Sequence, residues 1–299
     1  MLKSFTRLLF TLGSLALSMT AQANVQIFAC EPEWATLAKE LAGDRANTFA
    51  ATHAGQDPHH IQARPSLIAK LRSSDLAICT GAGLETGWMP MLQRRARNPK
   101  VMPGEPGYLE AAGQVERLEI PAALDRAEGD VHGDGNPHVQ LDPRRVLEIA
   151  KALSSRLQTI DPANKAHYLQ RVEAFSRRWL AAIQRWEAQA HALKGKRVIV
   201  HHREWTYLLD WLGMQRVGSL EPKPGIPPTL SHLADLKELQ ADRIIVSPLN
   251  DDKPSTWLHE QTGTDVVVLP QTVGAVKGTE DLFGLFDEII RRLTTGDGA

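Results

Sequence analysis

Three histidines in this sequence have neighbours that suit a metal ligand. His59 and His138 each follow a proline, and His202 follows an apolar run rich in β-branched residues. Imidazole nitrogens are common ligands of Zn²⁺, and a preceding proline restricts the backbone from which the ring projects. Asp57 and Asn136 lie two residues before His59 and His138 and could accept the second ring N–H. The three histidines together therefore predict a metal site.

The spacing does not settle every ligand. His60 follows His59 directly, and His201 precedes His202 directly. A single histidine beside a proline is more often a solvated loop residue than a ligand, so only the set of three carries the prediction. The sequence alone leaves the choice between each pair of neighbours open.

The elements expected around these histidines form two α/β units. Short β-branched runs alternate with amphipathic stretches, which is typical of parallel sheets covered by helices. We expect strands at 25–30, 47–52, 75–79, 197–201, 215–220, 243–246 and 265–269, and helices at 32–42, 65–72, 85–97, 203–212, 230–239 and 280–293. Ligands bind beyond the carboxyl ends of such strands. His59, after the second strand, and His202, at the end of another, should therefore face a crevice between the lobes, joined by His138 from a loop before a helix near Asp142.

A long helix is expected between the two units. Residues 162–193 contain no glycine and no proline beyond the first position, and apolar residues recur every three or four positions. A helix of this length would be roughly 45 Å long, which suits a rigid strut between lobes better than a coiled-coil partner helix. The predicted fold is thus α/β, with two parallel-sheet lobes joined by one long helix. The expected division is a leader at 1–23, lobes at 24–158 and 194–299, and the helix at 159–193.

The first residues predict export. Lys3 and Arg7 precede an apolar run, and a small-x-small cleavage signal follows at 21–23, as in a secretory signal peptide. The run is too short to span a bilayer, which takes about 20 apolar residues. We therefore expect a periplasmic monomer without direct membrane insertion. Cys30 has a poor lipidation context, and whether it pairs with Cys79 in a disulfide is left open.

The charge balance excludes some partners. The formal net charge is −1 at pH 7, whereas nucleic acids and anionic membranes require a basic excess on one face. We therefore expect no nucleic-acid partner.

Several segments together resemble one protein family. The segments are 56–59, 75–76 with 83–85, 136–139 with 141–143, 198–202 with Tyr207, and 221–225. They resemble the successive motifs of the cluster A-I substrate-binding proteins of metal ABC importers, over essentially the whole mature chain. The resemblance implies His59, His138 and His202 as metal ligands, two α/β lobes bridged by a long helix, and an ABC permease of the inner membrane as partner.

The chain departs from the family after the last strand. Many members place an aspartate there as fourth ligand, whereas this sequence has Pro270 and Gln271. Without that carboxylate Mn²⁺ and Fe²⁺ are disfavoured, so Zn²⁺ is the expected cargo, although Cu²⁺, Ni²⁺ and Co²⁺ could also bind. The candidates for the fourth ligand are water, His60, Glu204, Glu221 and Asp251. The stretch 128–134 is interpreted as an acidic turn rather than an auxiliary metal trap.

The predicted function is therefore capture and delivery of Zn²⁺, with His59 and His138 binding first and His202 completing the site. Zinc affinity should fall as the pH drops through the histidine pKa of about 6.5. Two alternatives remain, a periplasmic zinc chaperone or buffer and a hydrolase with an open three-histidine zinc site. The hydrolase lacks a recognised motif, and Glu204 is the one carboxylate placed to act as its base.

Overall fold

Two parallel sheets form the framework of the protein. The computed structural model describes residues 24–122 and 132–295, so the predicted leader lies outside it. The first sheet has the order β2-β1-β3-β4 and the second the order β6-β5-β7-β8, and every pairing in both is parallel. The strands are β1 (Val25–Ala29), β2 (Ala46–Ala50), β3 (Leu76–Cys79), β4 (Tyr108–Glu110), β5 (Arg197–Val200), β6 (Gln215–Ser219), β7 (Arg243–Val246) and β8 (Val266–Val268). This architecture confirms the predicted fold class.

Helices cover both sheets. They are α1 (Pro32–Ala42), α2 (Pro65–Arg72), α3 (Met89–Ala96), α4 (Pro143–Ile160), α5 (Lys165–Ala190), α6 (Thr206–Leu212), α7 (Leu230–Lys237), α8 (Lys253–Thr262) and α9 (Leu282–Thr295). Several begin with proline at the first positions, where its missing N–H costs no hydrogen bond. The predicted helix at 85–97 begins later, at Met89, because residues 81–88 form turns that open with Gly81 and Gly83 at positive φ. The sequence analysis missed β4 and α8.

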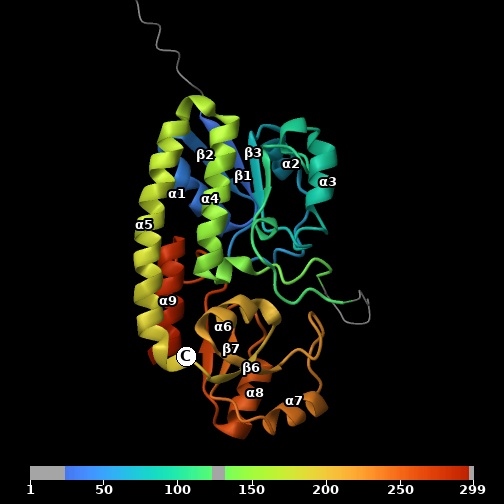
Figure 1. Cartoon of the computed structure of the whole chain (residues 1–299). Helices are drawn as coiled ribbons and strands as arrows, with labels where there is room; N and C mark the ends of the chain where they lie inside the picture. Colours follow the sequence, from blue (N-terminus) through green and yellow to red (C-terminus); the bar gives the residue numbers. More distant parts are fainter. Residues whose placement is uncertain (1–23, 123–131, 296–299) are drawn as a thin grey trace, which may run out of the picture.

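The long helix extends along both lobes. In Figure 1, α4 and α5 run side by side, with the upper part of α5 beside α1 and its lower part beside α9. Three-residue 3₁₀ turns extend α5 at each end, at Pro162–Asn164 and His191–Leu193. The buried face of α5 includes Phe175, Trp179 and Trp186. Trp179 donates a hydrogen bond to the carbonyl of Pro143 in α4 at 2.7 Å, and Trp186 donates one to Asp287 in α9 at 2.7 Å. Helix α5 is therefore attached to α4 and to α9.

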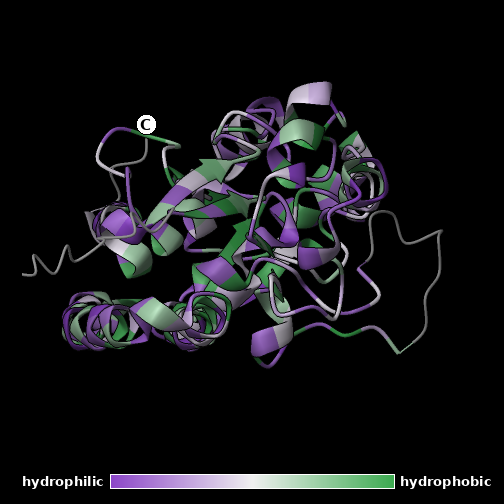
Figure 2. Cartoon of the chain, turned by 90° about the horizontal axis from the view of Figure 1, so that it is seen from above, coloured by the Kyte–Doolittle hydropathy of each residue, from purple (hydrophilic) through white to green (hydrophobic). Residues whose placement is uncertain are grey.

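The hydrophobic core follows the same layout. Buried side chains of β1, α1, α4, α5, β5, α6 and α9 form one continuous cluster across the two lobes, and smaller clusters fill the outer side of each sheet. Figure 2 shows hydrophobic strands at the centre and helices in which hydrophobic and hydrophilic residues alternate. A shared core of this kind favours small relative movements of the lobes over wide hinge opening.

Cys30 and Cys79 form a disulfide that joins the ends of β1 and β3. Their Cα atoms lie 4.7 Å apart across 49 residues of sequence, and both side chains are fully buried. A buried, bonded Cys30 agrees with the prediction that it is not a lipidated N-terminal residue. In the described ranges, no helix is long and apolar enough to cross a membrane.

Candidate metal centre

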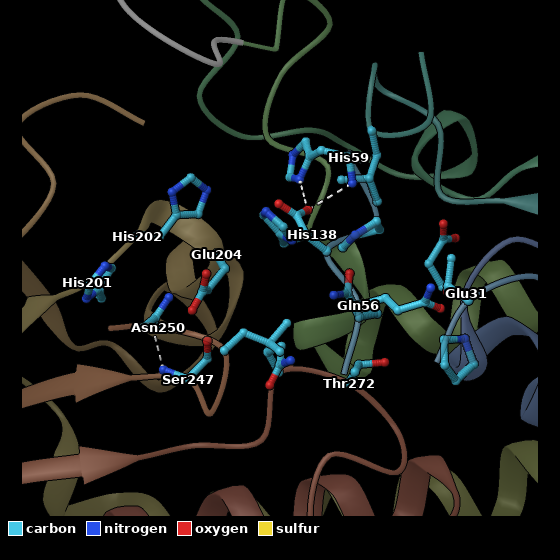
Figure 3. Close-up of a pocket in the computed structure, with 18 of the residues that line it drawn as sticks. Glu31, Gln56, His59, His138, His201, His202, Glu204, Ser247, Asn250 and Thr272 are labelled. Atoms are coloured by element: carbon cyan, nitrogen blue, oxygen red, sulfur yellow. Dashed lines mark hydrogen bonds and ion pairs between the residues drawn. The ribbon is translucent and has the colours of Figure 1, made fainter. Parts of the chain in front are cut away.

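A cleft of about 350 Å³ lies between the two lobes and contains the three predicted histidines. His59 is in the loop between β2 and α2, His138 directly precedes the 3₁₀ turn Val139–Leu141 before α4, and His202 follows β5. Figure 3 shows their imidazoles at one end of the cleft, with Glu204 below His202. Three chain segments that are far apart in sequence thus converge at one place.

The three imidazoles lie close together, but their nitrogens are not yet near enough to one another to bind a single ion. Ring centroids lie 6.3 Å apart for His59 and His138 and 5.9 Å apart for His138 and His202. Among the residues that the structure describes, one set of three potential ligand atoms lies mutually within 4.8 Å, and it comprises Cys30, Cys79 and Glu85. The disulfide occupies both sulfurs of that set. The three histidines would therefore need a small approach to share one ion.

Two of the histidines are held by carboxylates. Asp57 Oδ1 lies 2.8 Å from Nδ1 of His59, and Glu221 Oε2 lies 2.7 Å from Nδ1 of His202. A carboxylate accepts a hydrogen bond, so each Nδ1 carries the proton and each Nε2 is left for another partner. The hydrogen bond from His59 lowers the pKa of Asp57 to about 2. The partner predicted for His59 is correct, and Glu221, considered before as a ligand, instead orients His202.

His138 is the most buried of the three histidines. Its Nε2 has no hydrogen-bond partner among the described residues and is shielded from solvent. Burial, and after it the charges of His202 and His59, lower the pKa of His138 well below the usual value. A neutral imidazole with a buried nitrogen lone pair suits a metal ligand. Asn136, predicted to accept from the His138 ring, accepts the backbone N–H of His138 instead, at 3.0 Å.

The segment that carries His138 is tied to the turn that carries His202. The side-chain amide of Asn136 donates to the carbonyl of Arg203 at 2.9 Å. The hydroxyl of Tyr207 donates to the carbonyl of Asn136 at 2.6 Å and accepts the N–H of Leu118 at 3.1 Å. These contacts join a first-lobe loop to the second lobe.

The pKa of His202 is shifted in the opposite direction to that of His138. Burial alone would lower the pKa of His202, but the hydrogen bond to Glu221 and the negative charges of Glu204 and Asp57 outweigh it and raise the pKa. The same contact lowers the pKa of Glu221 against the effect of burial. Protons therefore compete with a metal more strongly at His202 than at His138.

The alternative ligands occupy different places. His60 is 72% exposed at its side chain, lies 3.9 Å from Asp57 and has its ring centroid 6.2 Å from that of His59. His201 is buried in the cleft wall, 3.9 Å from Glu221. Asp251 is exposed at the cleft rim and accepts the N–H of Lys253. His60 therefore stands beside His59 in solvent, while His201 and Asp251 belong to other parts of the cleft lining.

Glu204 is one of the carboxylates that line the cleft, together with Glu31, Glu33, Asp57, Glu221 and Asp251. It is 8% exposed, and its Oε1 is buried and has no hydrogen-bond partner within the described part of the chain. Burial raises its pKa, opposed by the charge of His202. A buried carboxylate oxygen of this kind can serve as a metal ligand.

One histidine of the stretch that the sequence analysis interpreted as an acidic turn, His132, lies beside His59. Nε2 of His132 lies 3.1 Å from Nε2 of His59, and the two rings stack with centroids 5.2 Å apart. His132 belongs to the stretch interpreted as an acidic turn, most of which lies outside the described residues. Its position six residues before His138 was the one sequence feature that could have indicated a role in the site. Only the folded loop brings His132 beside His59.

The fold and the histidine-lined cleft define the class of cluster A-I metal-binding proteins. The chain belongs to the family described as zinc-uptake complex component A, periplasmic (ZnuA), which matches residues 27–296. Relatives named as substrate-binding lipoproteins of metal and manganese ABC transporters favour a binding protein over the hydrolase alternative.

Individual relatives are similar at low identity. The zinc-binding lipoprotein AdcA of Streptococcus pneumoniae is 25% identical over 204 residues, 67% of this chain and 40% of AdcA, so the chain spans less than half of that relative. The manganese ABC transporter substrate-binding lipoprotein PsaA of the same species is 20% identical over 253 residues, 83% of this chain and 80% of PsaA. A crystal structure of ZnuA superposes with a TM-score of 0.76 at 19% identity, covering 92% of this chain and all of ZnuA, and supports the fold alone.

Proposed function

We propose that this chain is the periplasmic substrate-binding component of a metal ABC importer, which captures Zn²⁺ with His59, His138 and His202 and delivers it to the inner-membrane permease. The observation that carries the proposal is the convergence of the three imidazoles in the cleft between the lobes, with the Nε2 of His138 buried and unpartnered in the described chain. The carboxylates on the Nδ1 atoms of His59 and His202 support it, because they leave Nε2 for the metal.

The donor set favours zinc over manganese. The names of the relatives include both metals, so the choice for this chain rests on its own residues. Three imidazole nitrogens suit Zn²⁺, whereas Mn²⁺ prefers oxygen ligands. The position after β8 that carries an aspartate in many related proteins is Gln271 here, and its amide donates to the carbonyl of Ala54 at 3.4 Å. An amide cannot supply the negative charge that a carboxylate ligand would.

The contacts in the cleft suggest an order of binding different from the one expected from sequence. The Asn136 and Tyr207 contacts hold His138 close to His202 before any metal arrives. These two would therefore receive the ion first, and His59 from the first-lobe loop would complete the site. Closure on the ion would then involve a small rocking of the lobes.

Titration calorimetry of the chelator-stripped mature chain tests this function. We expect one tight Zn²⁺ site, weaker Mn²⁺ binding, and a loss of more than about 100-fold in zinc affinity for His59→Ala, His138→Ala or His202→Ala, because removal of an outer partner alone costs 10–100-fold. His60→Ala is the matched control and should bind zinc like the wild type, since its side chain points into solvent. Unchanged zinc binding in the three single variants would reject the site.

A further inference from the structure

We infer that His132 supplies the fourth ligand to the ion held by His59, His138 and His202, so that the site contains four imidazoles. This inference rests on the proposed function and adds a residue from the loop between β4 and α4. No carboxylate is needed to complete such a site.

The geometry of His59 and His132 already matches that of two ligands of one zinc ion. Their Nε2 atoms are 3.1 Å apart. In a tetrahedral site with Zn–N bonds of 2.0–2.1 Å, two ligand nitrogens lie about 3.3 Å apart. The two rings stack at an interplanar angle of 29° and are hydrogen-bonded to each other through Nε2, so both rings must turn before the two nitrogens face one ion. The separation of the two nitrogens itself needs a change of only a few tenths of an ångström.

His132 also borders the other two ligands. A small pocket of about 40 Å³ is lined by His132, His138 and His202, together with Asn136 and Arg203 among others. His132 therefore touches His59 on one side and shares a small space with His138 and His202 on the other. No three of these four histidines yet bring their ligand nitrogens within 4.8 Å of one another among the described residues, so His138 and His202 would have to move toward the His59–His132 pair to share one ion.

The backbone of the first lobe fixes the ring of His132 from behind. Gly83 has a φ of +87°, and a β-carbon at this position would lie 3.3 Å from Nδ1 of His132. The ring is packed closely against this turn, so that Nδ1 faces Gly83 while Nε2 faces His59. A larger residue at position 83 would press on the ring, which is consistent with a glycine there.

The protons in the contact can be assigned from the hydrogen bonds. Asp57 accepts a hydrogen bond from Nδ1–H of His59, so Nε2 of His59 is unprotonated and can act as an acceptor. In the metal-free protein Nε2 of His132 is then the donor. Metal binding requires this proton to leave Nε2, either to solvent or by a change of tautomer to Nδ1–H. The His59–His132 hydrogen bond is exchanged for two metal bonds.

Glu204 is the rival for the same coordination position. Its Oε1 is buried and unpartnered among the residues described, so this oxygen forms no hydrogen bond there with any of the three histidines. His132, by contrast, is already at ligand separation from His59. The two assignments differ in chemistry, since a four-imidazole site favours Zn²⁺ over Mn²⁺ more strongly than a site with a carboxylate.

The test compares His132→Ala and Glu204→Gln in the mature chain. Zinc affinity is measured by competition with a chelator of known affinity, and the number of imidazoles around bound zinc is counted by X-ray absorption at the zinc edge. His191→Ala is the control, because His191 is an exposed histidine at the end of α5 and is not among the residues that line the cleft. Thermal unfolding of each metal-free variant checks that it folds.

We expect four imidazoles in the wild type and three in His132→Ala, with zinc affinity about 10- to 100-fold lower in that variant and unchanged in His191→Ala. Glu204→Gln removes a negative charge near His202, so it should weaken zinc binding less than His132→Ala does and leave four imidazoles around the ion. Three imidazoles in the wild type, or full affinity in His132→Ala, would overturn the inference. Weakened binding in Glu204→Gln alone would assign the position to the carboxylate instead. Tight binding that survives loss of His59, His138 and His202 together would instead reject the proposed function itself.

Discussion

Two carboxylates orient the imidazoles of His59 and His202 through the ring nitrogen that faces away from the proposed ion. Asp57 and Glu221 each accept from the Nδ1 of a histidine, so that the opposite nitrogen faces the proposed ion. The two pairs differ in how they are built. Asp57 is two residues from His59 and also accepts its backbone N–H at 2.9 Å, whereas Glu221 reaches His202 across 19 residues and also accepts the N–H of Gly225 at 3.0 Å. The Glu221 carboxylate therefore depends on the loop after β6.

Glu221→Gln should weaken zinc binding by about 10- to 100-fold, which is the usual cost of losing the outer partner of a metal-bound histidine. An amide can still accept a hydrogen bond but carries no charge, so His202 becomes a poorer electron donor to the ion. Calorimetry with zinc measures the change. Glu238→Gln, an exposed glutamate of the same lobe, is the control, and an equal affinity in both variants would show that Glu221 does not act through His202.

At the scale of elements, the cleft depends on contacts between the segment before α4 and the start of α6. Tyr207 bonds to the backbone at Asn136 and Leu118, and Arg145 lies over its ring, 4.7 Å from the centroid. Glu119 adds contacts with Arg216 at 2.7 Å and with Asn136 at 2.9 Å. These bonds connect the first-lobe loop to the second lobe beside His138 and His202.

Tyr207→Phe should lower both stability and zinc affinity. Loss of the hydroxyl leaves a backbone N–H and a carbonyl without their partner, which costs about 1–3 kcal/mol. The released His138 segment should reduce zinc affinity about tenfold, at the lower end of the effect of lost ligand orientation. Chemical denaturation and zinc titration measure the two effects.

Tyr168→Phe is the matched control for this prediction. Its hydroxyl donates to Asp161 at 2.6 Å near the start of α5, away from the cleft. It should destabilise the protein and leave zinc affinity unchanged. A loss of zinc affinity of the same size in both variants would mean that the effect is general destabilisation.

At the scale of the whole molecule, the lobes share a core along α5 and also meet at the cleft. Glu33 at the start of α1 accepts a hydrogen bond from the hydroxyl of Thr272, which follows β8 in the second lobe. Burial raises the pKa of Glu33 to about 7 from its ordinary value. The folded protein thus retains a proton at this lobe contact at pH values where the unfolded chain has lost it.

The free energy of unfolding of the metal-free protein should therefore depend on pH through Glu33. The raised pKa contributes stability that is complete below about pH 4.5 and is lost as the pH rises through about 7, and the full shift corresponds to about 3 kcal/mol. Denaturation at pH 5 and pH 8 should show a smaller decline for Glu33→Gln than for the wild type or for Glu260→Gln, an exposed control. An unchanged decline in Glu33→Gln would contradict this assignment.

The sequence by itself determined the fold class and the long helix. Period-two and helical hydrophobic patterns are local properties, so the alternation of strands and helices, and the uninterrupted stretch at 162–193, could be recognised without any tertiary information. The two missed elements, β4 and α8, are a three-residue strand and a helix with few buried residues. Segments that are this short, or that have so few buried positions, show no clear hydrophobic period.

The composition of the candidate site was decided by tertiary structure. The three histidines could be proposed from motifs, and Asp57 from its position two residues away, because these signals are local. Glu221 reaches His202 from another loop, and His132 meets His59 across 73 residues. The strand order placed the three predicted histidines at one crevice, but which side chains of the neighbouring loops reach them depends on how those loops fold, and spacing along the chain does not show this.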